Sequence, residues 1–371
     1  MDFAFDPEQE ELRRTVRAFL DDTSPEPETR RLMETEAGYE PALWRRMGSE
    51  LGLQGLAVPE EYGGAGCGPV ETGLVLEEMG RALLCAPYFA SAVLATTALV
   101  RSADEDARKR LLPGLAAGEL VGTLALTEDS ARWDLEGVAL TARRHGDRWL
   151  LSGHKTFVLD GATADFVLTV ARTPEGIAVF LVDGDAPGLT RTPLPTLDPT
   201  RRQARLEYRD VPAEPLRTAG DGWALVSEVL DRAAAALAAE QVGVAARALD
   251  MAVEYAKVRR QFGRPIGSFQ AVKHLLADVL MEVESARAAA YFALLAADTE
   301  DPDLPAVASL AKAFCSDACL TATSQNIQVH GGIGFTWEHP AHLYLKRAKT
   351  SQLLLGDPAY HRELLARRIG V

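Results

Sequence analysis

The sequence has 371 residues, more than the roughly 250–300 over which a single hydrophobic core usually extends, so we expect two or three domains. Its 47% hydrophobic and 25% charged residues are ordinary for a soluble globular protein and exclude a disordered or fibrous chain. The net charge of −14, from 39 Lys and Arg against 53 Asp and Glu, disfavours nucleic-acid binding because an acidic surface repels phosphate.

Cysteine content and the amino terminus favour a cytoplasmic enzyme. Four cysteines are too few for a disulfide framework in a chain of this length. The amino terminus is acidic where a secretory signal would be basic and then apolar. The most apolar stretches, 233–239 and 93–100, are shorter than the ~20 residues of a membrane-spanning helix, so we expect no integral membrane protein.

Residues 1 to about 120 are predicted to be helical. Leu12, Val16 and Leu20 follow helical spacing, and Pro25 with Pro27 ends that helix. Further helices are expected near residues 40–51, 70–83, 91–99 and 104–115, and a Gly-rich loop over residues 58–69. We therefore expect an N-terminal helical domain over residues 1–120.

The middle of the chain has a different character. Short β-rich runs at residues 149–151, 166–170, 177–182 and 204–209 are separated by Gly, Pro and Asp turns, and no segment suits a long helix. This pattern predicts a middle antiparallel β-barrel domain over residues 121–217.

Helical periodicity returns in the last part of the chain. Long helices are expected at residues 225–258, 269–296 and 305–329, followed by a shorter pair. Ser268 suits an N-cap and Pro305 a first helical turn. We expect a C-terminal four-helix bundle over residues 218–371, and thus an α+β fold.

Two stretches of the last part carry unusual groups of residues. Residues 255–278 combine a helix end, a Gly/Pro turn and a new helix start with several polar side chains. Residues 328–340 place three glycines after a long helix, where a backbone can approach a ligand closely. Taken singly, the first could be a helix hairpin with solvated arginines and the second a C-capping loop.

Together and in this order, the two stretches closely resemble the acyl-CoA dehydrogenase family of flavoproteins. The resemblance covers essentially the whole chain, including the loop at residues 59–64. It implies a cytoplasmic enzyme of lipid metabolism, of the fatty acid β-oxidation kind. It also implies FAD, held between the middle domain of one subunit and the C-terminal helices of a neighbour in a homo-oligomer, either a dimer or a tetramer.

The resemblance assigns FAD contacts residue by residue. Arg259 matches an arginine that reaches the FAD pyrophosphate of a neighbouring subunit, a contact that suits a guanidinium group. The other matching residues are Phe262 and Gln270 along the adenosine portion, Gln328, Gly331 and Gly332 on the other side of the pyrophosphate, and Leu126, Thr127 and Phe157 at the flavin.

The implied reaction is the α,β-dehydrogenation of an acyl-CoA thioester to the 2,3-enoyl-CoA, with electrons passed on to an electron-transfer flavoprotein. In the family, a carboxylate removes the α proton while the β hydrogen passes as hydride to the flavin. That base must be Glu or Asp in a dry pocket, where its pKa can be adjusted.

Both positions that hold this base in the family are apolar in the present sequence. The position before the carboxy-terminal Gly is Leu355, and the position on the long helix after the β domain is Ala233. Either the base has moved or the chain has lost it.

Two carboxylates are candidates for a moved base. Asp357 lies on the same loop as Leu355, although Asp before Pro is also a common N-cap. Glu240 lies on the same helix face as Ala233, although it could instead form a salt bridge to Arg232 or Arg247.

Further departures lie at the expected flavin contacts, where the chain has the bulky Trp133 and, in place of a threonine, Leu159. Paired assemblies are known in the family, especially in actinobacterial steroid and lipid catabolism, in which one subunit keeps only half of the FAD determinants. The alternative is therefore a non-catalytic or half-site partner in an α2β2 heterotetramer with a paralogous subunit.

Two other classes of site are disfavoured. His330, His339 and His342 lack a carboxylate partner, so no metal site is expected. Nucleic-acid-associated members of the fold carry a basic carboxy-terminal extension, which does not follow the last predicted helix, so no nucleic-acid partner is expected.

Overall fold

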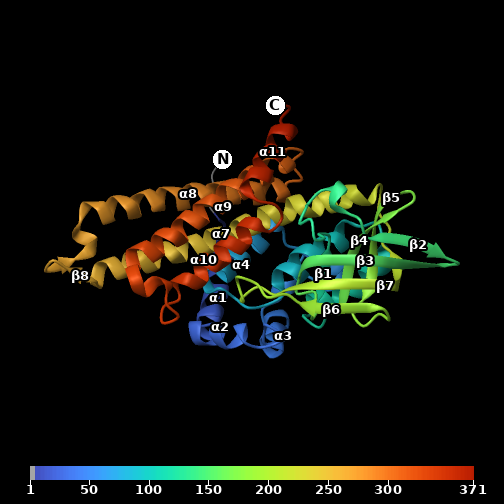
Figure 1. Cartoon of the computed structure of the whole chain (residues 1–371), viewed down its shortest axis with the longest axis horizontal. Helices are drawn as coiled ribbons and strands as arrows, with labels where there is room; N and C mark the ends of the chain where they lie inside the picture. The colour runs from blue at the N-terminus through green and yellow to red at the C-terminus, as the bar shows by residue number, and fades with distance from the viewer. Residues whose placement is uncertain (1–4) are drawn as a thin grey trace. The chain divides into compact units, whose positions relative to one another are not determined.

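The computed structural model describes residues 5–371, which divide into two units (Figure 1). The helical unit comprises the chain up to Arg30, Pro69–Leu84 and Ala234–Val371, and the barrel unit comprises Arg31–Gly68 and Cys85–Ala233. The predicted domain boundaries near residues 120 and 218 stay predictions. The units cut across the first predicted domain, because Pro69–Leu84 packs with the carboxy-terminal helices.

The order of helical, β-rich and helical segments along the chain is as the sequence predicted. The helices of the helical unit are α1 Pro7–Thr23, α4 Pro69–Ala82, α8 Gln270–Asp298, α9 Leu304–His330, α10 Ala341–Leu353 and α11 Pro358–Arg368. Two further helices, α2 Glu26–Met33 and α7 Gly222–Val258, contain residues of both units.

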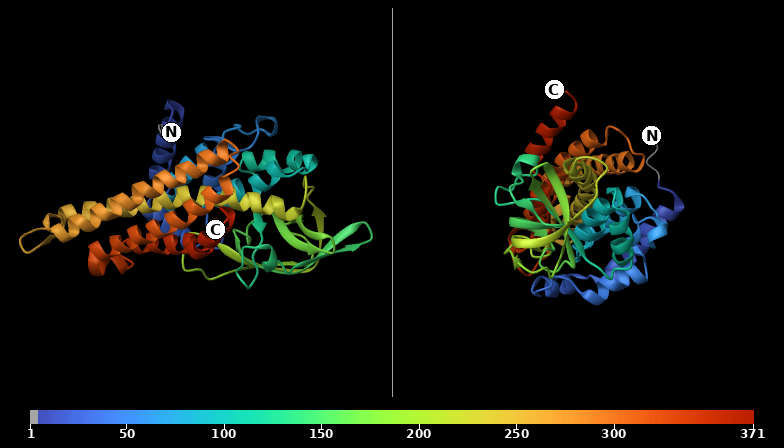
Figure 2. Two further views of the ribbon diagram at one scale, coloured as in Figure 1. Left: turned by 90° about the horizontal axis from the view of Figure 1, so that it is seen from above. Right: turned by 90° about the vertical axis from the view of Figure 1, so that its right-hand side faces the viewer.

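The long helices α7, α8 and α9 lie side by side and share one core (Figure 2). Alanines dominate their contact faces, so the helix axes can approach closely. This buried set comprises Ala235, Ala238, Ala239 and Val242 of α7, Ala286, Ala290 and Leu294 of α8, and Ala311, Cys315 and Ala318 of α9. The alanine-rich run in the sequence is thus a close-packed helix face.

Charged side chains are buried where α4 meets α1 and α8. Glu77 and Glu78 of α4 are almost fully buried. Arg13 forms ion pairs with Glu77 and Glu78 at 3.0 and 3.2 Å, and Arg17 pairs with Glu78 at 2.7 Å. Arg287 of α8 completes the network on Glu77. These ion pairs compensate the cost of burying two carboxylates and fix three helices against one another.

The barrel unit contains one sheet of seven strands. Its strands are β1 Gly122–Ala125, β2 Thr141–His145, β3 Arg148–Leu159, β4 Phe166–Thr173, β5 Gly176–Asp183, β6 Leu189–Pro193 and β7 Gln203–Pro215. The pairings close a ring in the order β4, β2, β3, β7, β5 and back to β4, while β1 adds to β4 and β6 to β7.

The middle domain is the predicted β-barrel, and its pairings are antiparallel with two exceptions. Strand β1 pairs with β4 in parallel, as does the first residue of β2. The sequence runs predicted β3, β4, β5 and β7, but β1, β2 and β6 were missed because they are short and β2 is polar. The helices α3 Pro41–Ser49, α5 Thr96–Arg101 and α6 Glu105–Ala116, with the π-helical turn Phe89–Ala95, complete this unit.

Helix termini follow the expected signals at most positions. Asp6 forms a capping box at α1, and Pro305 lies in the first turn of α9, as predicted. Ser268 is not the N-cap of α8: the cap residue is Phe269, and the Ser268 hydroxyl donates instead to the Pro265 carbonyl at 2.7 Å. Within residues 5–371, no helix has the length and hydropathy to cross a bilayer.

Glycines at the crossing of α4 and α7 give a first prediction. A Cβ atom at Gly243 would overlap the Glu77 carbonyl oxygen. The helix propensity that alanine adds is worth ~1 kcal/mol, whereas such overpacking costs about 1–3 kcal/mol or more. We expect Gly243→Ala to lower the melting temperature, as measured by circular dichroism. Gly220→Ala, where a Cβ meets nothing within 4 Å, is the control and should have no such effect.

Candidate functional site

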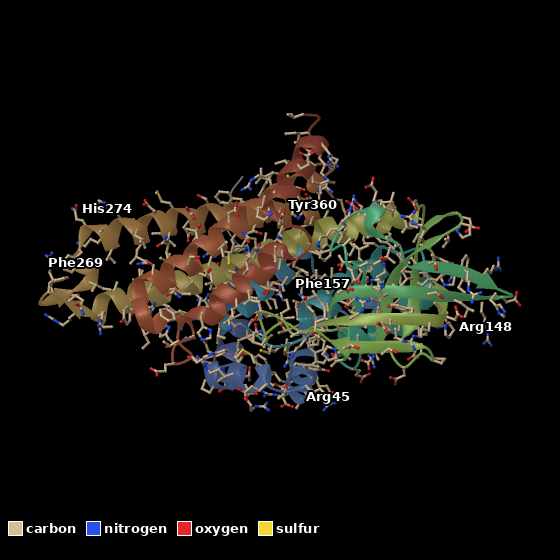
Figure 3. The ribbon with its side chains drawn as sticks, viewed as in Figure 1. Arg45, Arg148, Phe157, Phe269, His274 and Tyr360 are labelled. Carbon is tan, nitrogen blue, oxygen red and sulfur yellow. The ribbon has the colours of Figure 1, made fainter. Side chains whose placement is uncertain are left out.

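The first candidate stretch forms a hairpin between α7 and α8. Strands β8 Arg260–Gln261 and β9 Arg264–Pro265 pair across Gly263, whose φ of +77° suits the turn. The hairpin is anchored by a hydrogen bond from the Ile266 N–H to the Arg259 carbonyl at 2.8 Å. Figure 3 labels Phe269 at the base of this hairpin and His274 in the first turns of α8.

Arg259 and Phe262 project from this hairpin into solvent. Phe262 is 92% exposed and has a φ of +51°, so its ring points outward from the hairpin turn. Within residues 5–371, no hydrogen bond or ion pair engages the Arg259 side chain. Gln270 follows at the exposed start of α8. The predicted contacts of this stretch therefore stand together at one end of the helical unit with their polar atoms available.

The second candidate stretch reaches the same end of the helical unit. His330, in the last turn of α9, stacks on Tyr255 of α7 with ring centroids 4.3 Å apart, and its Nδ1 lies 2.8 Å from the Asn326 carbonyl. Burial lowers the pKa of His330, which favours the neutral ring in this stack. Because Tyr255 lies one turn before Arg259, the two stretches meet.

Gln328, Gly331 and Gly332 are exposed beside this stacked pair. Gly331 caps α9 with a φ of +64°, and added Cβ atoms at Gly331 and Gly332 would meet nothing within 4 Å. The structure therefore brings Arg259, Gln328 and the two glycines to one exposed end.

The barrel unit holds the other predicted contacts. Leu126 and Thr127 follow β1, and their side chains are buried. Thr127 and Thr156 exchange a pair of hydrogen bonds, at 2.7 Å from the Thr127 hydroxyl and 2.8 Å from the Thr156 N–H. Phe157 on β3 is 39% exposed and has a φ of +62°, and Figure 3 shows it on its strand.

The loop around Leu355 is held from beneath by buried polar groups. Leu355 itself is buried, with a φ of +64°, and its carbonyl accepts from His361 Nε2 at 3.0 Å. The Lys312 ammonium donates to the carbonyls of Gln352 and Gly356 at 3.2 and 3.1 Å. Burial lowers the pKa of Lys312 to about 7. Lys312 could not be identified from the sequence, because a single lysine in an apolar helix does not reveal its partners.

Asp357 is exposed on this loop. One of its carboxylate oxygens accepts from the Tyr360 N–H at 2.8 Å, which confirms the N-cap interpretation for α11. The cap uses only this one oxygen among residues 5–371, so it does not by itself exclude a chemical role.

Glu240 is in a different environment. It is 2% exposed and lies 2.9 Å from Arg347 of α10, which is also buried. Arg347 additionally donates to the Leu84 carbonyl at 3.4 Å. Glu240 thus forms a salt bridge with Arg347, a partner other than the expected Arg232 or Arg247. Arg347 lies too far along the chain for the sequence to have suggested it. Arg347 accounts for the burial of this carboxylate, and a catalytic role for Glu240 stays a prediction.

The residues that face solvent fit a phosphate-bearing, planar cofactor. A guanidinium without a partner, two open glycines and an amide side chain suit a pyrophosphate, and an exposed aromatic ring suits a flat ring system. These features fit the FAD that the sequence implied. Within residues 5–371, no group of three His, Cys, Asp or Glu could hold a metal ion.

Comparisons with known proteins cover the whole chain. The acyl-CoA dehydrogenase N-terminal domain model matches residues 6–119, the middle domain model residues 123–211 and the C-terminal domain model residues 220–370. Acyl-CoA dehydrogenase IpdE2 of Mycobacterium tuberculosis is 38% identical over 363 residues, covering 97% of this chain and 96% of the relative.

Two solved structures are similar over nearly their full length. A variant of the Tcur3481-Tcur3483 steroid ACAD gives a TM-score of 0.89 at 34% identity and covers 98% of both chains. The ChsE4-ChsE5 complex from Mycobacterium tuberculosis gives a TM-score of 0.91 at 30% identity, covering 100% of this chain and 99% of the other.

The pair Glu240–Arg347 gives a second prediction. Removing one partner of a buried ion pair leaves the other charge uncompensated, which costs about 3–5 kcal/mol. We expect Glu240→Gln to lower the melting temperature by several degrees, and the double variant Glu240→Gln/Arg347→Met to recover part of the loss. If Glu240→Gln melted like the wild type and lost only turnover, a catalytic Glu240 would be the better explanation.

Proposed function

This chain belongs to the acyl-CoA dehydrogenase family, and we propose that it is one subunit of a paired acyl-CoA dehydrogenase, to which it contributes part of an FAD site and no base of its own. Family membership indicates acyl-CoA dehydrogenation as the reaction and FAD as the cofactor. When bound, FAD supplies the acceptor for the hydride that leaves the acyl chain.

The observation that carries the proposal is a contrast between the positions of the catalytic base and the residues suited to the cofactor. Both positions that hold a base in the family are buried and apolar, with Leu355 at 3% and Ala233 at 0% exposure. The Arg259 guanidinium, in contrast, is exposed and without a partner among residues 5–371. The chain has kept the groups suited to a partner's cofactor and lost the group suited to the reaction.

The charge of the hairpin supports a role toward an anion on another subunit. Residues 255–277 contain five Lys and Arg and no Asp or Glu, in a chain whose net charge is −14. Such a concentration attracts phosphate, and a guanidinium can bind two of its oxygens at once. Arg259 would hold the pyrophosphate, while Gln328 and the backbone at Gly331 and Gly332 would orient the adjoining portion.

Similar structures supply the second line of support. The Tcur3481-Tcur3483 and ChsE4-ChsE5 proteins are both named as pairs of different chains, and the first is named a steroid ACAD. By this similarity we propose an α2β2 assembly with a paralogous chain. The substrate would be an acyl-CoA of lipid or steroid origin, and the electrons would go to an electron-transfer flavoprotein.

A self-sufficient homo-oligomer is the second candidate function, and the position of Asp357 favours it. This carboxylate is exposed, lies on the loop of the lost base and uses one oxygen for the cap of α11. A base at Asp357 would let the chain complete the reaction without a paralogue.

Arg259 provides the third prediction. Arg259→Ala should lower the flavin content of the assembled protein by at least about tenfold, as expected for the loss of a charge-assisted phosphate contact. The control is Arg260→Ala, since the Arg260 guanidinium donates to the Gly263 carbonyl of its own hairpin at 3.0 Å. Equal flavin content in both variants and the wild type, read from the visible absorbance per chain, would refute the role of Arg259.

Asp357 provides the fourth prediction, which separates the two candidate functions. Asparagine can still accept from the Tyr360 N–H, so Asp357→Asn should keep the melting temperature. A paired enzyme whose base lies on the other chain should keep its turnover with this variant. A loss of turnover by more than about a hundredfold, in protein purified without a paralogue and carrying one flavin per chain, would instead establish the homo-oligomer with Asp357 as base.

A further inference from the structure

A buried ion pair joins two segments of the barrel unit that carry predicted flavin contacts. The Lys155 side chain on β3 is fully buried, and its ammonium lies 2.8 Å from Glu128 Oε1 and 2.9 Å from the Leu126 carbonyl. The same Glu128 oxygen also accepts from the N–H groups of Ala139 and Leu140 at 2.9 and 2.8 Å. The carboxylate is therefore held by three donors on one oxygen.

Thr156, next to Lys155 on β3, also forms hydrogen bonds with residues 126–129. Thr156 exchanges two hydrogen bonds with Thr127, and its hydroxyl donates to Asp129 at 2.7 Å. Arg205 of β7 adds a contact to Asp129 at 2.5 Å. Each of the four residues 126–129 is thus bonded to Lys155 or Thr156.

Phe157 follows directly on β3 and has an unusual backbone. Its φ of +62° is costly for a residue with a bulky side chain. The register between β3 and β7 shifts between Lys155 and Val158. Phe157 therefore lies in a β-bulge, where β3 has one residue more than β7. Such a conformation persists only where neighbouring contacts impose it. The Phe157 ring stays partly exposed, although burying an aromatic ring is energetically favourable.

We propose that Lys155 and Glu128 are positioning residues, which hold residues 126–129 against β3 so that the ring of Phe157 is presented outward to the flavin. This proposal rests on the proposed function, because it takes FAD as the ligand of Phe157. Neither Lys155 nor Glu128 touches the cofactor; they act through the backbone of Leu126 and through the strand that carries Phe157.

A purely stabilising role explains the pair less well. Burying two charges costs desolvation energy, and well-packed apolar residues often replace such a pair without loss of stability. For Lys155, burial is the largest influence on its pKa, which falls to about 8 despite the nearby carboxylate. The pair is better explained by the geometry it imposes, since it bonds the carbonyl of Leu126 and the backbone at Ala139 and Leu140 simultaneously.

The test uses the full chain with the double substitution Lys155→Met/Glu128→Gln, which removes both charges together and keeps similar side-chain volumes. The matched control is Arg143→Met, which removes the exposed ion pair from Arg143 of β2 to Asp210 of β7 at 2.9 Å in the same barrel. Hydrogen exchange is followed peptide by peptide in the FAD-free chain. FAD affinity is then measured by titration of the assembled protein with FAD.

We expect exchange in the double variant to rise at least about tenfold at residues 126–129 and 155–158, while β4 and β5 keep their protection. FAD affinity should fall at least about tenfold, and Arg143→Met should change neither quantity. If the double variant does not fold, Glu128→Asp, which keeps both charges but draws the carboxylate back from its donors, should raise exchange at the same residues by about threefold.

Unchanged exchange at residues 126–129, or a uniform rise over the whole sheet, would overturn the positioning role. So would unchanged FAD affinity in a variant whose exchange had risen. A wild-type assembly that bound no FAD would refute the proposed function and with it the ligand assigned to Phe157. Because the exchange comparison needs no FAD, it would still show whether the pair holds residues 126–129.

Discussion

Buried ion pairs between segments far apart in the sequence are the constraint on which both units depend. Each pair must be complete, because a single buried charge costs far more than a broken surface contact. Glu77 and Glu78 require arginines from α1 and α8, and Glu240 requires Arg347 from α10. Lys155 and Glu128 do the same within the barrel unit. Such pairs fix which helices and strands are neighbours more strictly than apolar contacts, which tolerate sliding.

The exposed arginines of the hairpin between α7 and α8 differ from the paired arginines elsewhere in the helical unit. Most arginines of the helical unit have carboxylate partners, as in the pairs from Arg13, Arg287 and Arg347. Arg259 has none among residues 5–371, and its hairpin is rich in cations on an otherwise acidic chain. Repulsion among these cations destabilises the free chain slightly, and a phosphate ligand would relieve it. The charge of the hairpin therefore suits the pyrophosphate of the proposed FAD ligand.

The sequence predicted the long helices near residues 225–258, 269–296 and 305–329. These predictions succeeded because apolar periodicity, prolines and glycines act locally. Predictions that depend on distant partners failed or were missed: Arg347 as the partner of Glu240, Lys312 beneath the loop of Leu355, and the parallel pairing of β1 with β4. Phe269 displaced Ser268 as the cap of α8 because the serine hydroxyl bonds within the preceding turn.

The environments of Leu355 and Asp357 bear on whether the chain has lost the catalytic base or has moved it to another residue. Leu355 is buried and its carbonyl accepts from His361, so an ionised side chain without a partner at that position would be costly. Asp357 is exposed, and one of its carboxylate oxygens accepts from the Tyr360 N–H. An effective base needs partial desolvation to raise its pKa. Among residues 5–371, Asp357 is exposed and so lacks such desolvation. Under the proposed function, a second subunit would supply either the cover or the base itself, and in both cases the assembly would be the catalytic entity.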